Sequence, residues 1–198
     1  MRRLLLIMAV LFILSSSVGF AIVQSLFAET TGGGAGAGAL NRFLEMLVKM
    51  VRELGITPYD PLSIIKIFLK NLLAAAVSIA TGVLVLPPFL IIMLNGFVVG
   101  VVLGVTTVRG VGFLAALSMI LPHGVFEIPA LLLAAAVGVR LGADLWFRIL
   151  GRGERVYYTN LNRFLGHLVV VALLLFVAAV VEVYVTPAVA HYTVSIGL

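Results

Sequence analysis

Two side chains that could do acid-base or metal chemistry, His123 and Glu127, lie four residues apart in a stretch that is otherwise almost wholly apolar. Pro122 and Pro129 enclose them. At positions i and i+4, two side chains share one face of a helix. An ionisable group at membrane depth costs roughly 2.5 to 3.5 kcal/mol on insertion scales, so it persists where a partner or water compensates it. The pair is therefore either a salt bridge that locks a kink or part of a functional site, such as half of a metal site.

The composition of the chain identifies its solvent. Hydrophobic residues make up 63% of the 198 residues and charged residues only 11%, and the mean hydropathy is +1.25. These values predict an integral membrane protein that contacts lipid. The net charge is +5, and most of the excess positive residues lie beside apolar segments, where they orient the protein in the membrane. We therefore expect no nucleic-acid partner. The sequence has no cysteine, which excludes disulfides, thiolate ligands and a cysteine nucleophile.

The first apolar segment runs from Leu4 to Ala28 without a charge, directly after Arg2 and Arg3. It is long enough for a tilted transmembrane helix, which needs about 20 residues. A cleaved signal peptide is the alternative, because the residues before Ala28 resemble a cleavage region. We favour an N-terminal transmembrane anchor over residues 1–28, since the apolar stretch is longer than the core of a usual signal peptide.

The next segment, residues 29–61, contains a linker and a short helix. Residues 32–38 are all glycine or alanine, which predicts a flexible linker. From 39 to 54, apolar residues recur at i, i+3, i+4 and i+7, which predicts an amphipathic helix that stops at Gly55. This helix is too short to span a membrane. We expect it to lie in the interface or to pack over the bundle, with a mobile lid as the alternative.

Prolines divide the remaining apolar chain into spans. The charge-free stretch 72–108 is too long for one crossing, and Pro87-Pro88 must divide it. This gives a second span over about 63–86 and a third over about 88–108. Lys70, near the start of the second span, is expected to snorkel toward the interface.

The region 111–145 is again too long for one straight crossing, and the prolines break it at Pro122 to Gly124. We read 110–121 as a half-helix or re-entrant segment that leads into a full helix over about 124–147. The last span covers about 164–185. The predicted fold class is therefore all-α: a polytopic transmembrane helical bundle with a broken or re-entrant helix and a short amphipathic helix.

The distribution of arginine orients this bundle. Arg2 and Arg3 flank the first span. Four more arginines fill the connection before the last span: Arg148, Arg152, Arg155 and Arg163. Positive residues favour the cytoplasmic side, so the N-terminus should be cytoplasmic, with 29–61 and the tail from Thr186 external. The chain is then one membrane domain, 1–198, of a multi-pass protein of the cell membrane. Its last part, 151–198, supplies the cytoplasmic loop, the last span and the external tail.

Four polar side chains lie inside the expected spans: Asn71, Asn95, His123 and Glu127. Isolated in hydrocarbon, each would lose hydrogen bonds worth about 1 to 3 kcal/mol. We therefore expect them to converge on one ligand-binding pocket at mid-membrane, where His123 and Glu127 could hold a divalent metal ion. Structural hydrogen bonds between helices are the alternative for the two asparagines. Glu182, near the outer end of the last span, is as consistent with an exposed carboxylate as with a site residue.

Glycines recur every four residues in two of the spans. They are Gly96, Gly100 and Gly104 in the third span, and Gly138 and Gly142 in the fourth. Small residues at this spacing let helices approach closely. The partner is either another span of the same chain or a second copy, so a homodimer is one of two expectations.

Four strings of the chain carry a resemblance: the apolar sequence around Asn71, Asn95-Gly96 with Gly100, the string from Pro122 to Ala130, and the string from Gly138 to Gly142. In this order they resemble the stage II sporulation protein M family of multi-spanning membrane proteins, over about residues 62–150. The resemblance implies an all-helical integral membrane protein. The bacterial namesake takes part in engulfment during sporulation, with partners that remodel peptidoglycan. Many relatives occur in organisms that do not sporulate, so the resemblance transfers candidate site residues and no role.

Two classes of function remain open. The first is a membrane scaffold or transport-related subunit that works with membrane or envelope proteins and uses the polar residues as an ion or ligand site. The alternative is an intramembrane, metal-assisted hydrolase that acts on a lipid-linked substrate. The first is favoured because one histidine and one glutamate lack the nucleophile or additional ligands that an enzyme site shows.

Overall fold

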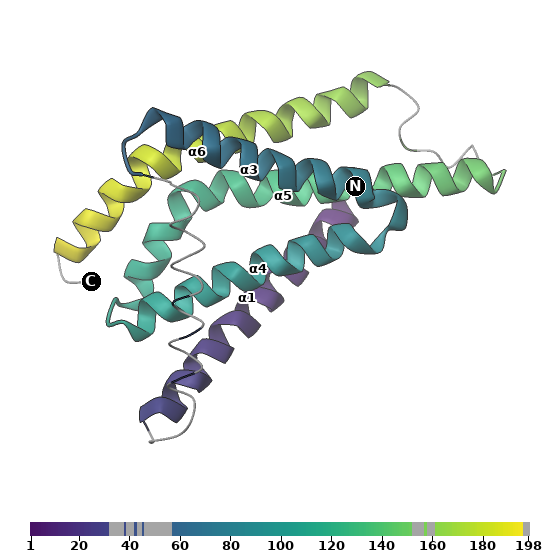
Figure 1. Cartoon of the computed structure of the whole chain (residues 1–198). Coiled ribbons are helices and arrows are strands. Elements are labelled where there is room, and N and C mark those ends of the chain that lie inside the picture. The colour runs from purple at the N-terminus through teal and green to yellow at the C-terminus, as the bar shows by residue number, and fades with distance from the viewer. Residues whose placement is uncertain are drawn as a thin grey trace.

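A computed structural model describes residues 1–31, 38, 42, 45, 57–151, 157 and 161–195, with 29–31 and 194–195 described by their backbone alone. Its helices are α1 (Arg2–Thr31), α3 (Pro61–Ala80), the 3-10 turn η1 (Thr81–Leu84), α4 (Leu86–Val108), α5 (Phe113–Ile149) and α6 (Leu161–Ser195) (Figure 1). Among the described residues, five helical segments are long and apolar enough to cross a membrane. The predicted all-α, multi-pass membrane fold is confirmed.

The boundaries of α3 follow from its local sequence. Asp60 is the N-cap, because its carboxylate accepts a hydrogen bond of 3.1 Å from the backbone N–H of Leu62. Pro61 takes the first helical position, where no backbone N–H is needed. At the far end, Val85 has φ 63°, and Pro87 follows in the first turn of α4. The predicted division of the long apolar stretch at Pro87-Pro88 is confirmed.

The predicted linker over 32–38 and the amphipathic helix over 39–54 lie almost entirely outside the described residues. Only Gly38, Arg42 and Glu45 are described there, and each is helical. The last span is longer than predicted, since α6 continues to Ser195.

Helix α5 runs through both of its prolines without interruption. Pro122 and Pro129 lie inside one helix that extends from Phe113 to Ile149. Figure 1 shows that the first part of α5 runs at a steep angle to the rest. A proline removes one N–H donor and clashes with the preceding turn, which bends a helix. The predicted re-entrant segment is not confirmed, because the bend leaves the helix continuous.

Helix α5 is the centre of the bundle. It contacts α1, α3, α4, α6 and η1, whereas α1 packs chiefly against α4. Figure 1 shows α3, α5 and α6 as one group, with α1 and α4 as a second group that crosses it. Ala130, Ala134 and Ala135 are fully buried in the core between the groups. These small side chains allow four neighbouring helices to approach α5.

Glycines on α4 form its contact with α1. A Cβ atom on Gly100 would meet the carbonyl of Ser16, and one on Gly96 would meet the carbonyl of Phe12. Gly19 of α1 lies equally close to the backbone of α4. The partner of this glycine face is therefore another span of the same chain, so the face gives no support to the expected homodimer.

A second glycine contact joins η1 to α5. Gly82 lies against the backbone of Gly138, and Gly142 lies against the carbonyl of Gly82. One turn further along α5, the indole Nε1 of Trp146 donates a hydrogen bond of 3.0 Å to the carbonyl of Val83. Because no side chain separates the two backbones, these glycines fix the position of α3 along the axis of α5.

Filling the α1–α4 contact should destabilise the protein. We expect Gly100→Leu to lower the melting temperature in detergent, because overpacking typically costs about 1 to 3 kcal/mol and here the added atoms meet backbone. Gly166→Leu on α6 is the matched control, since no atom lies within 4 Å of its Cβ position. Equal melting temperatures for the two variants would contradict the packing of α1 on α4.

The cap at the start of α3 should make stability depend on pH. The hydrogen bond from the Leu62 N–H lowers the pKa of Asp60, and bonds from Thr57 and Ser63 and the charge of Lys66 lower it further. A lowered folded-state pKa stabilises the fold above the unfolded value of about 3.9, and this contribution is lost as the pH falls through the folded pKa.

We therefore expect Asp60→Asn, which keeps a capping oxygen, to melt below the wild type at pH 7 and level with it in strong acid. Thermal melting across the acid range measures this difference. A gap that does not change with pH would show that the charge of Asp60 contributes nothing.

Candidate functional site

Three side chains with metal-ligating atoms meet between α5 and α6. His123 and Glu127 come from the part of α5 between Pro122 and Pro129, and Glu182 comes from α6. One ligand atom from each lies within 4.8 Å of the other two, and all three residues are half-buried. The structure therefore brings together the two residues predicted to hold a metal and adds a second carboxylate.

Helix α6 also orients the histidine. The Nδ1 atom of His123 lies 3.2 Å from the hydroxyl oxygen of Thr186, which follows Glu182 by one helical turn. This hydrogen bond leaves Nε2 of the imidazole for another partner. A fixed ring with one free nitrogen is the arrangement that metal-ligating histidines usually show.

A proline on α6 fixes the level of the cluster in the bundle. Pro187 has no N–H to donate to the carbonyl of Val183, and this carbonyl instead accepts a hydrogen bond of 3.2 Å from the backbone N–H of Tyr59. The rings of Tyr59 and Tyr184 lie 6.3 Å apart. Tyrosines gather at membrane–water interfaces. Glu182 is thus next to the residue through which α6 contacts the segment that precedes α3.

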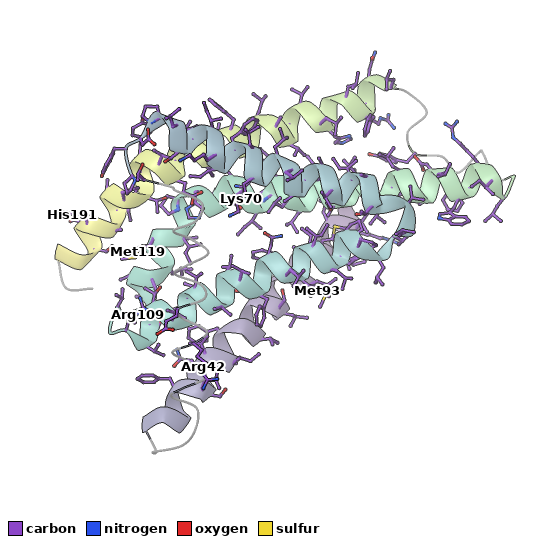
Figure 2. The ribbon with its side chains drawn as sticks, in the orientation of Figure 1. Arg42, Lys70, Met93, Arg109, Met119 and His191 are labelled. Atoms are coloured by element: carbon purple, nitrogen blue, oxygen red, sulfur yellow. The ribbon has the colours of Figure 1, made fainter. Side chains whose placement is uncertain are left out.

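Lys70 adds a positive charge to the cluster. Its ammonium group is close enough to act electrostatically on His123, Glu127 and Glu182. Figure 2 shows Lys70 on α3, in front of α5. Helical side chains point toward the helix N-terminus, so the side chain of Lys70 is directed toward the start of α3. The sequence predicts this direction for a snorkelling lysine but does not reveal the carboxylates that it meets.

The two predicted asparagines are placed differently from the cluster. The side-chain amide of Asn95 donates a hydrogen bond of 2.8 Å to the carbonyl of Ile91, one turn earlier in α4. Asn71 is buried on α3. In the described part of the chain, no hydrogen bond joins either asparagine to His123 or Glu127. Of the four predicted residues, the structure thus brings His123 and Glu127 together. A binding role for the two asparagines stays a prediction.

The sequence alone leaves the role of Glu182 open and does not place Thr186 in the site. One signal was present in the sequence: Pro187 follows Glu182 by five residues and marks a place where a helix must find a new hydrogen-bond donor. The pairing of α6 with α5 was not readable, because no spacing within one helix reports which helix lies beside it.

The cluster contains more acidic than basic groups. With both carboxylates ionised and the imidazole neutral, two carboxylates and one ammonium group would leave one negative charge in excess. Carboxylates this close repel each other, and burial between helices weakens the screening by water. The arrangement therefore favours a bound cation or proton, and one nitrogen with two carboxylates can serve as a three-ligand metal site.

Comparison with known proteins supports the family that the motifs suggest. The family model for stage II sporulation protein M matches residues 8–187. An uncharacterized protein of Methanocaldococcus jannaschii is 32% identical over 111 residues, which is 56% of this chain and 62% of that relative. The chain thus spans less than two thirds of the relative's length. No solved structure matches. The chain belongs to the stage II sporulation protein M family.

Proposed function

We propose that this membrane protein is a scaffold or transport-related subunit whose central feature is a cation site made by His123, Glu127 and Glu182. The observation that carries the proposal is that ligand atoms from two different helices lie within 4.8 Å of one another. A cation held there joins α5 to α6. Membrane or envelope proteins are the expected partners of such a subunit.

The ligand set favours a divalent transition metal. Imidazole nitrogen suits zinc, iron and nickel, while carboxylate oxygen suits manganese as well, and a mixed set accepts zinc or manganese. Lys70 supplies a positive charge beside the carboxylates. A metal ion and this ammonium group would repel each other, so Lys70 should weaken metal binding.

The hydrolase alternative has one observation in its favour. Three protein ligands leave the fourth position of a tetrahedral zinc site open, as catalytic zinc sites do, and a metal there would activate water. We rank this alternative second, because it requires a substrate-binding site beside the metal in addition to the three ligands. Hydrolysis of a lipid-linked substrate by the metal-loaded wild type, lost in Glu127→Gln, would reverse the ranking.

Metal binding to the detergent-solubilised chain tests the proposal. We expect chelator-treated wild type to bind zinc or manganese in calorimetric titration, and Glu127→Gln and Glu182→Gln to abolish binding because each removes a ligand. Thr186→Val should weaken binding about 10- to 100-fold, the usual effect of losing the partner that orients a ligand. Glu45→Gln is the matched control, since Glu45 is an exposed carboxylate on another segment.

Lys70→Met separates this proposal from a purely structural salt bridge. At a metal site the variant should bind the cation more tightly, because the competing positive charge is gone. In a structural ion pair it would only lower the melting temperature. Weaker metal binding by Lys70→Met, or no binding by the wild type, would rule out the proposed site.

We also propose that the N-terminus is cytoplasmic, on the basis of the arginine distribution. In intact cells, an impermeant thiol reagent should label Ala35→Cys and should not label Gly153→Cys. The chain has no native cysteine, so each variant carries a single reactive thiol. The opposite labelling pattern would show the opposite orientation. Labelling of both positions from one side would contradict an odd number of crossings between positions 35 and 153.

A further inference from the structure

A hollow of about 610 Å³ lies where the start of α1 meets α5. Arg2, Arg3 and Arg140 line its polar part, and apolar residues such as Leu4 and Ile7 line the remainder. Figure 1 places the N-terminus over α5, toward the end where α5 leads on to α6. The hollow therefore combines three arginine side chains with an apolar wall.

The third arginine is held in place by its neighbours. The guanidinium carbon of Arg140 lies 5.1 Å from the ring centroid of Tyr157, and that of Arg163 lies 5.5 Å from the same ring. The backbone N–H of Tyr157 donates a hydrogen bond of 2.8 Å to the carboxylate of Asp144. The stacked ring fixes Arg140 from outside the hollow and leaves its charge uncancelled by the contact.

The lining explains which ligand would fit. None of the residues that line the hollow carries a carboxylate. Arginine binds phosphate oxygens through paired N–H donors, and basic pockets between transmembrane helices accept anionic head groups. Ile7 is 52% exposed on the outer surface of α1, so the apolar wall continues onto the surface that faces lipid chains.

We propose that this hollow binds the phosphate of an anionic membrane phospholipid, with Arg2, Arg3 and Arg140 on the phosphate and an acyl chain along Leu4 and Ile7. The site is separate from the cation cluster and does not depend on it. It is formed only when α1 is seated on α5, so a bound lipid would favour that packing.

Lipid retention in native mass spectrometry tests this proposal on the full chain. After extraction from nanodiscs of equal phosphatidylglycerol and phosphatidylcholine, the wild type should retain phosphatidylglycerol preferentially. Arg140→Gln should lose about five-fold in this retention, the effect expected of one basic side chain near an anionic lipid surface. Arg109→Gln is the matched control, because Figure 2 shows Arg109 near the far end of α4, away from the N-terminus.

The double variant Arg2→Gln with Arg3→Gln guards against a folding effect in α5, and it should lose phosphatidylglycerol while keeping the wild-type melting temperature. Equal retention by Arg140→Gln, Arg109→Gln and the wild type would overturn the proposal, as would equal retention of the two lipids by the wild type. Displacement of the lipid by millimolar inorganic phosphate would overturn it as well, because the site would then serve a soluble anion.

Discussion

The contact between the backbones of Gly82 and Gly138 sets the register on which the polar cluster depends. Helices α3 and α5 run in the same direction (Figure 1). Lys70 precedes Gly82 by about three helical turns, and Glu127 precedes Gly138 by about three turns as well. Because both residues lie about the same distance from this contact along their helices, the ammonium group and the carboxylate lie at the same level of the bundle. A side chain at either glycine would shift the helices apart and separate the charges.

On α6, a proline helps to fix the position of the segment that precedes α3. Pro187 frees the Val183 carbonyl, and the Tyr59 N–H takes it, which ties the segment before α3 to the turn of α6 that carries Glu182. A buried carbonyl without a partner is costly, so the missing donor specifies where the neighbouring chain must lie. The glycine contact and this hydrogen bond act at different levels of α3, and together they align α3 with both helices that supply ligands.

The sequence predicted the secondary structure of each segment but not which helices pack against one another. Apolar runs and prolines were enough to divide the chain at Pro87-Pro88 and to predict an all-α membrane bundle, because these signals are local. The consequence of Pro122 was predicted less well, since a proline in a long helix can bend it without ending it. Glu182 could not be assigned, because its role depends on the packing of α6 against α5, and helical spacing reports faces but not partners.

The packing of α1 on α4 has a consequence for biosynthesis. Gly19 and Ser16 of α1 face the backbone of α4, yet α4 ends roughly 75 residues after the end of α1. At about 5 to 20 residues per second, α1 must wait roughly 4 to 15 s in the bilayer before its partner is synthesised. Its apolar surface allows that wait, because lipid tails solvate an unpaired apolar helix without penalty. Helix α1 therefore pairs with α4 only after the intervening helix α3 has been synthesised.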